Sequence, residues 1–250
     1  MSERRLPTIL EREPLVDAVF EVRLGGNPHL ADLLPGILFN QLGPRPTLER
    51  LATADIPEPI RVSEPNLAFA PVIRLHWREF AISFGSRNVV IACKLPYPKW
   101  PRFKDAILDI VDKVSQVGIS GPIERYSLKY VNLIQAPTVA EQIQKINLAI
   151  RVGDVDVKDD HVSVQVHRTE GETLHIMSVV TGAKGKMADG KLVSGAVVDI
   201  DSIRPIQFPD FRTFAENLGE AVETLRTENK IKFFSCLTEA TVDEMGPKYD

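Results

Sequence analysis

Residues 123–134 carry the longest strand pattern in the chain and limit the fold more than any other segment. They read I-E-R-Y-S-L-K-Y-V-N-L-I. The apolar face consists of Tyr126, Leu128, Tyr130 and Ile134, and the opposite face of Arg125, Ser127 and Lys129. Alternation with a period of two is typical of a half-buried β-strand. We therefore expect this segment to lie centrally in a sheet, with Asn132 as a polar exception.

Composition excludes several classes of protein. The chain has 250 residues, of which 44% are hydrophobic and 26% charged, as in an ordinary globular protein. The net charge of -4 argues against a protein that coats nucleic acid or an anionic membrane, because both need a dominantly basic surface. We therefore expect neither nucleic acid nor membrane as a partner, although a local basic patch stays open.

The two cysteines and the N-terminus indicate the compartment. Cys93 and Cys236 lack metal-ligand spacing, which favours buried free thiols in a reducing compartment over catalysis. The first residues lack the apolar run of a secretory signal, and no later stretch reaches about 18 uninterrupted apolar residues. We expect a cytoplasmic protein.

The first half of the chain is predicted to contain strands, two helices and a proline-rich connection. An alternating strand follows Pro14, and a helix capped by Asn27 is expected to begin at Pro28 and to be kinked or split by Pro35. Prolines in residues 43–71 argue against helix there and permit only short edge strands near residues 56–62. An antiparallel meander over residues 72–94 and an amphipathic helix over residues 103–117 complete this half.

The second half is predicted to contain further strands and one long helix. Asp210 is expected to cap this helix, whose apolar stripe includes Phe211, Phe214 and Leu218. Consecutive strands joined by tight turns predict an α+β fold, in which antiparallel sheets carry helices on one face. We place two sequential halves at residues 1–136 and 137–250, with one continuous domain as the alternative.

Four ordered motifs carry a resemblance to a known family. They are P-L-V-D-A-V-F-E-V-R at residues 14–23, L-P-Y-P-K-W-P-R-F at 95–103, R-Y-S-L-K-Y-V-N-L-I at 125–134 and F-F-S-C-L-T at 233–238. Together they resemble an uncharacterised, sporadically distributed prokaryotic family with this length, order and spacing. The resemblance spans nearly the whole chain and implies a shared fold, but no assigned activity. Lys129 stands where arginine is more frequent in that family.

Two histidines and two aspartates are candidates for contacting a ligand. A three-residue hairpin loop at residues 169–171 would pair Val166 with Leu174 and place His167 and His175 diagonally on one face. Asp199 and Asp201 share one face of a later strand, but no third metal ligand is identifiable and we expect no metal. A solvated polar face explains the histidines, and solvated or ion-paired carboxylates explain the aspartates, so both interpretations stay open.

Basic residues offer a second candidate site. Residues 181–191 bring three glycines together with Lys184, Lys186 and Lys191, which could face a phosphate. The segment lacks the Gly-Lys-Ser/Thr ending of a nucleotide-binding loop, so a loop without a ligand is the alternative. Arg125 and Lys129 are further candidates for contacting an anion. If their strand neighbours the first strand, these bases meet the acids Asp17 and Glu21, and we expect this face to be exposed to solvent.

The sequence favours a non-enzymatic binding or assembly module that acts with a protein partner or by self-association. Trp77, Tyr97 and Trp100 are the candidate interface anchors, and ordinary packing of these aromatic residues is the alternative. The competing hypothesis is a small-molecule or nucleotide-processing enzyme with a site near His167, His175, Asp199 and Asp201. Whether any reaction is catalysed stays undecided, and no cofactor is expected because the common catalytic and cofactor motifs are absent from the sequence.

Overall fold

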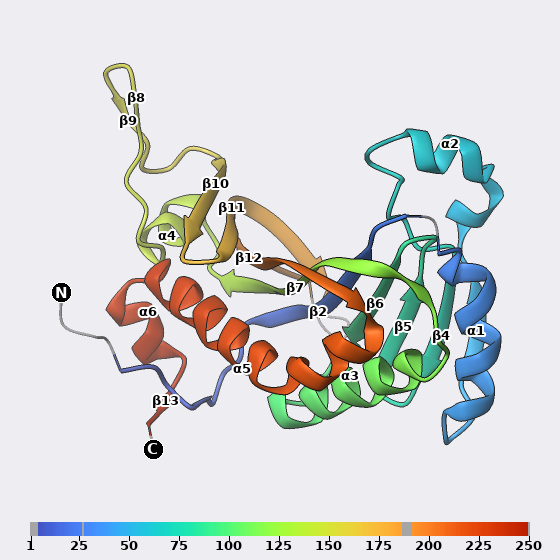
Figure 1. The fold of residues 1–250 in the computed structure, drawn as a ribbon. Coiled ribbons are helices and arrows are strands. Elements are labelled where there is room, and N and C mark those ends of the chain that lie inside the picture. The colour runs from blue at the N-terminus through green and yellow to red at the C-terminus, as the bar shows by residue number, and fades with distance from the viewer. Residues whose placement is uncertain (1–4, 27, 187–191, 250) are drawn as a thin grey trace. The chain divides into compact units, whose positions relative to one another are not determined.

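The computed structural model describes residues 5–26, 28–186 and 192–249 (Figure 1). It is an α+β protein with a large antiparallel sheet component and several helices. Two compact units are present. The first unit consists of Met1–Val16, Lys129–Ser202 and Arg226–Asp250, and the second unit of Asp17–Leu128 and Ile203–Leu225. Both units are therefore discontinuous in sequence, unlike the two sequential halves favoured above.

The discontinuity arises because four elements run through both units. They are β2 (Leu15–Leu24), β7 (Ser120–Gln135), β12 (Leu192–Asp210) and α5 (Phe211–Ser235). β7 is the strand predicted from residues 123–134, and it lies between β12 and β2 in the strand order. Tyr126, Leu128 and Ile134 are buried on its apolar face. The central position predicted for this strand is confirmed.

The sheet of the second unit has the strand order β12-β7-β2-β6-β5-β4-β3. Its remaining strands are β3 (Thr47–Arg50), β4 (Ile73–Trp77), β5 (Phe80–Phe84) and β6 (Asn88–Cys93). The pairs β3–β4, β4–β5, β5–β6 and β2–β6 are antiparallel, which confirms the predicted meander. Alternate side chains of these strands, among them Phe20, Val22, Leu75, Ile82 and Ile91, form a fully buried apolar layer.

The helices of the second unit agree only in part with the sequence. α3 (Trp100–Ser115) buries the predicted apolar stripe, and Phe103 stacks on Phe80 with 6.2 Å between ring centroids. α1 (Leu30–Gln41) begins after His29 rather than at Pro28, and it continues through Pro35 as one helix. The predicted cap Asn27 lies outside the described residues.

The proline-rich segment contains helix where only strand was expected. A 3-10 helix (Ala52–Asp55) and α2 (Glu58–Ser63) follow β3. Pro57 is the N-cap of α2 and Pro59 falls in its first turn, where the missing N–H group has no helical partner to lose. The prediction of edge strands near residues 56–62 was wrong because these prolines lie at a helix start instead of a helix interior.

The first unit has the strand order β10-β11-β12-β7. It adds β10 (Ser163–Glu170), β11 (Thr173–Lys186), α4 (Val139–Gln144) and α6 (Glu239–Glu244). Two small ribbons pair β8 (Arg151–Val152) with β9 (Val155–Asp156) and β1 (Ile9–Leu10) with β13 (Pro247–Lys248). Its core joins side chains of β12 to the end of α5, among them Val198, Ile200, Phe233, Phe234 and Leu237.

Helix α5 follows the sequence prediction closely. Asp210 accepts a hydrogen bond from the Thr213 backbone N–H (2.9 Å), and this contact holds the pKa of the Asp210 carboxyl below its ordinary value. The side chains of Phe211, Phe214 and Leu218 are buried as expected. Within the described parts of the chain, no helix has the length and apolar character needed to cross a bilayer.

Candidate functional site

The hairpin of β10 and β11 has a different register from the predicted one. Glu170 pairs with Thr173 across a two-residue turn, in which Gly171 has a φ of 56°. Arg168 consequently pairs with His175, and His167 pairs with Ile176. Directly paired residues share a sheet face, so His167 and His175 lie on opposite faces. The prediction of a three-residue loop with both histidines on one face was wrong.

His175 belongs to a buried polar network in the first unit. Its Nδ1 shares a hydrogen bond with Ser202 Oγ (2.9 Å), and Asn229 Nδ2 donates to Ser202 Oγ and to the Ile200 carbonyl, each at 2.9 Å. The exposed fractions are 1% for His175, 0% for Ser202 and 2% for Asn229. A Ser–His pair is the arrangement of an activated nucleophile, but solvent does not reach this serine. The geometry therefore supports a structural role for the network.

This network also explains the hairpin register. Thr173, which is fully buried, donates through Oγ1 to Glu228 Oε2 (2.6 Å) at the same face as His175. Polar residues can therefore occupy inward positions because α5 offers a partner to Thr173 and β12 offers one to His175. Periodicity alone treats such positions as solvent-facing, which is why it favoured another register.

Asp199 and Asp201 do not join His175. Successive residues of β12 alternate between the two faces, so these aspartates lie opposite Ile200 and Ser202. Asp199 Oδ2 forms an ion pair with Lys129 Nζ (2.8 Å). The four residues of the competing enzyme hypothesis are thus divided between the two sheet faces. Among the residues that the structure describes, no group of three potential metal ligands occurs.

The predicted anion contacts lie in different settings. Arg125 Nη2 lies 3.3 Å from Glu21 Oε2, which confirms that the polar faces of β2 and β7 meet. Their side chains are largely buried, with exposed fractions of 27% and 14%, so the expectation of a solvent-exposed face was wrong here. Lys184 is exposed on β11, whereas the side chain of Lys186 and all of Lys191 lie outside the described part of the structure.

The three aromatic candidates pack inside the second unit. Trp77 is 4% exposed and stacks near Phe80, and Trp100 is 9% exposed. The Trp100 indole donates to both carboxylate oxygens of Glu223, at 2.9 and 3.0 Å, and its ring meets Phe103 edge to face. Tyr97, which is half-buried, also contacts the Phe103 ring. Exposed interface anchors were the wrong expectation for Trp77 and Trp100, because this aromatic cluster buries them.

The exposed surface of the first unit is organised around β10. This strand stands at one end of the strand order, and seven of its eight residues are exposed. Val166 on β10 is 46% exposed. The ribbon of β8 and β9 presents two more valines, Val152 and Val155, to solvent. An end strand leaves one row of backbone N–H and C=O groups without a strand partner, which makes it a template for an added strand.

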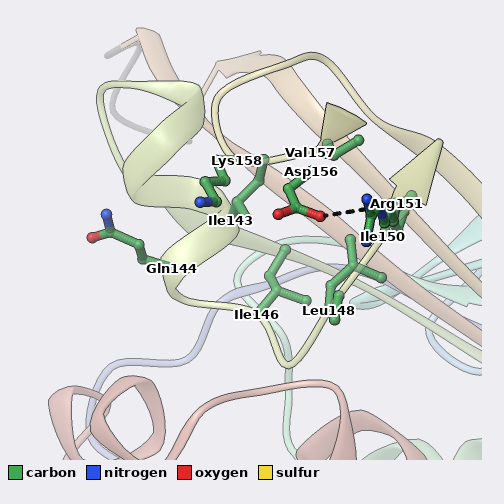
Figure 2. Close-up of a pocket in the computed structure, with 10 residues that line it drawn as sticks. Ile143, Gln144, Ile146, Leu148, Ile150, Arg151, Asp156, Val157 and Lys158 are labelled. Carbon is green, nitrogen blue, oxygen red and sulfur yellow. Dashed lines mark ion pairs between the residues drawn. The ribbon is translucent and has the colours of Figure 1, made fainter. Parts of the chain in front are cut away.

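A cavity of about 610 Å³ lies beside α4 (Figure 2). Its apolar wall consists of Ile143, Ile146, Leu148, Ala149, Ile150 and Val157. Arg151 and Asp156 stand at one side, where their charged groups are 3.8 Å apart, and Lys158 supplies another charge (Figure 2). A mainly apolar wall with a few charged groups is typical of sites that hold an apolar side chain or small ligand. Sequence reasoning missed this cavity because residues 143–158 carry no motif.

The two cysteines offer no reactive site. Both are free thiols. Burial raises the pKa of the Cys93 thiol strongly, and the negative charges of Asp17 and Glu79 raise it further. Burial likewise raises the pKa of Cys236. Both sulfurs therefore stay protonated near neutral pH, whereas a nucleophilic cysteine needs a lowered pKa.

Comparison of the chain with protein families and with curated proteins finds no match in either set.

Proposed function

We propose that this chain is a cytoplasmic protein-binding module that adds an extended segment of a partner protein to the outer edge of β10. The exposed edge strand is the observation that carries the proposal. In this mode of recognition, backbone hydrogen bonds supply affinity and pockets for side chains supply selectivity. The cavity beside α4 offers such a pocket on the same unit.

The side chains of β10 support strand addition. Natural edge strands that avoid pairing carry lysine, proline or a bulge, and β10 reads S-V-Q-V-H-R-T-E without lysine or proline. Its charges also compensate each other, since Arg168 Nε lies 3.4 Å from Glu170 Oε1. An approaching strand therefore meets little net charge, and Val166 adds apolar area at the edge.

Two further points support the compartment and the family that we propose for this protein. The free state of both cysteines agrees with a reducing compartment. The four sequence motifs support membership of the sporadically distributed prokaryotic family that the chain resembles. Neither point names the partner, which must be found by experiment.

The edge-strand proposal is tested by selecting binders from a peptide library displayed on phage against the purified protein. We expect enrichment of proline-free sequences with alternating apolar residues, because such peptides extend easily and match a strand. Val166→Lys introduces lysine, the residue with which natural edge strands prevent pairing. It should weaken the binding of the selected peptides by about tenfold, or about 1.4 kcal/mol. Hydrogen exchange of bound protein should show new protection in β10.

The matched control is Ile231→Lys on α5, since Ile231 has the same exposed fraction of 46% in the same unit. It should leave peptide binding unchanged. Equal binding by wild type, Val166→Lys and Ile231→Lys would contradict strand addition at β10. Light scattering after size exclusion tests self-association in parallel: a dimer that Val166→Lys alone dissolves would identify the added strand as that of a second copy.

A further inference from the structure

Two arginines contact one phenylalanine ring in the second unit. The Cζ of Arg23 lies 3.9 Å from the ring centroid of Phe69, and the Cζ of Arg87 lies 4.6 Å from it. Arg23 is near the end of β2 and pairs with Asn88, the residue after Arg87. Phe69 comes from the segment between α2 and β4. A guanidinium over an aromatic face is a stable and partly desolvated arrangement, which orients the arginine.

A third arginine joins this group through Glu21. The Glu21 carboxylate accepts hydrogen bonds from Arg23 Nε (2.8 Å), Arg125 Nη2 (3.3 Å) and Asn88 Nδ2 (2.7 Å). Asn88 Nδ2 also donates to the Phe69 carbonyl (2.9 Å), so the strands and the Phe69 segment form one connected network. We call Arg23, Arg87, Arg125, Glu21, Asn88 and Phe69 the arginine cluster.

The positive charge of the arginine cluster exceeds its negative charge. Three guanidiniums and one carboxylate give a net charge of about +2. Among the described residues, Glu21 is the carboxylate within ion-pair distance of these arginines. Glu58 on α2 lies nearby in the fold, but its carboxylate contacts Ser86 Oγ (3.3 Å) and His29 Nδ1 (3.4 Å) instead.

The arginine cluster also contains an unused donor. Arg125 Nε is buried and has no hydrogen-bond acceptor within the described part of the chain. A buried donor without an acceptor costs about 1–3 kcal/mol. Arg87 is held by stacking on Phe69, which leaves the donors at the edge of its planar guanidinium for another group. An oxyanion would engage the Arg87 donors, because arginine binds phosphate and carboxylate through paired N–H groups. Arg125 Nε is itself shielded from solvent, so Arg125 would contact the anion through its Nη groups.

We propose that the arginine cluster is a binding site for the phosphate group of a small phosphate monoester, with Arg87 and Arg125 as its main donors. A phosphate monoester carries about -1.5 to -2 charges at pH 7, which matches the excess of about +2, whereas a carboxylate compensates only half of it. Arg23 donates to Glu21 at 2.8 Å, a shorter contact than that of Arg125 at 3.3 Å, so Arg23 contributes by stacking on Phe69 and by its positive charge. This site is independent of the edge strand β10 and of the protein-binding role proposed above.

The test uses inorganic phosphate and the full-length protein. Calorimetric titration and thermal melts are compared at constant ionic strength, with sodium chloride in place of phosphate as the reference. We expect saturable phosphate binding and a rise in melting temperature beyond that in chloride. Arg87→Gln and Arg125→Gln should each weaken phosphate binding by about tenfold, since a charged hydrogen bond to an oxyanion is lost.

Arg74→Gln is the matched control, because Arg74 lies on the same sheet but is already bonded to Ser83 Oγ (3.1 Å) and paired with Glu49 (3.5 Å). It should leave phosphate affinity unchanged. If Arg125→Gln does not fold, Arg87→Gln retains the test, because stacking on Phe69 is the contact that the described residues make with the Arg87 side chain. A phosphate response equal to that of chloride, or one that Arg87→Gln leaves intact, would overturn the proposal. Tighter binding of a nucleoside monophosphate than of inorganic phosphate would support a monoester as ligand.

Discussion

The two units treat their polar side chains in opposite ways. In the first unit, His175, Ser202 and Asn229 form a buried polar network whose members bond one another beneath α5. In the second unit, two arginines of the arginine cluster contact the Glu21 carboxylate and the third stacks on Phe69, while Arg125 Nε has no acceptor in the described structure. A buried network that satisfies itself contributes stability and specifies packing. A charged network with donors left over has the capacity to bind an anion.

By this comparison, the arginine cluster is a better candidate for a ligand site than the residues around His175. His175 beside a serine has the chemical appearance of catalysis, yet burial excludes solvent and substrate from it. Arg87 and Arg23 carry no catalytic motif, yet their guanidiniums are oriented by Phe69 and exceed the nearby negative charge. Solvent exposure and unsatisfied hydrogen-bond donors, rather than residue type, distinguish the arginine cluster from the network of His175, Ser202 and Asn229.

The largest effect is expected from Asn229→Leu, which breaks the buried polar network of the first unit while keeping the side-chain volume nearly constant. Ile200 O and Ser202 Oγ would lose a buried donor, and we expect a loss of about 3 kcal/mol in the free energy of unfolding. Urea denaturation measures this loss. Asn217→Leu is the control, because Asn217 on α5 is exposed and should change stability by no more than about 0.5 kcal/mol. Equal losses in both variants would show that the network contributes nothing beyond helix propensity.

A smaller loss is expected from Glu21→Gln, which removes the one negative charge of the arginine cluster. The variant keeps the shape of the side chain but leaves three guanidiniums uncompensated. Because these arginines are partly exposed, we expect destabilisation of about 2 kcal/mol, below the cost of breaking a fully buried pair. Inorganic phosphate should restore more of the stability in this variant than it adds to wild type. Unfolding curves with and without phosphate decide the point; an equal gain in both proteins would argue against anion binding here.

The sequence predicted the elements better than it predicted their polar contacts. β2, the meander of β4 to β6, β7 and α5 follow from periodicity, because one face of each is apolar. The contact between Arg125 and Glu21 also follows, once their two strands are taken as neighbours. Arg87 and Phe69 could not be placed with them, because Phe69 lies in a proline-rich segment whose path depends on tertiary contacts.

The failures have a common physical cause. Trp77 and Trp100 looked like interface anchors because composition does not reveal which aromatic residues pack on one another. The predicted hairpin register was wrong because Thr173 finds a hydrogen-bond partner in Glu228 on α5, and His175 finds one in Ser202 on β12. The cavity beside α4 is formed by isoleucines that look like ordinary core residues in the sequence. In each case, the packing of the folded chain decided the outcome, and a local sequence pattern does not show that packing.

The smallest effect is expected at Lys230, a partly buried cation on α5 in the first unit. Like the arginine cluster of the second unit, it carries positive charge that is not compensated by a partner among the described residues. Burial, together with the nearby positive charge of Arg226, lowers the pKa of its ammonium group from 10.5 to about 8. The unfolded chain therefore binds more protons than the folded chain between about pH 8 and pH 10.5, so this residue makes stability rise with pH across that window. Below about pH 8 the folded state carries the full desolvation cost.

Lys230→Met should remove this cost, because methionine keeps the unbranched stem without the charge. After allowance for solvent screening of a partly exposed group, we expect the melting temperature at pH 7 to rise by about 2 °C. The difference from wild type should shrink as the pH rises from 8 toward 10.5, because folded Lys230 is then mostly neutral and above 10.5 the unfolded chain loses the same proton. Lys232→Met is the control, since it removes the ion pair of Lys232 with Glu170 (2.6 Å) and should lower the melting temperature. A gain for Lys230→Met that is the same at pH 7 and pH 10 would show that packing, rather than the charge, limits stability at this position.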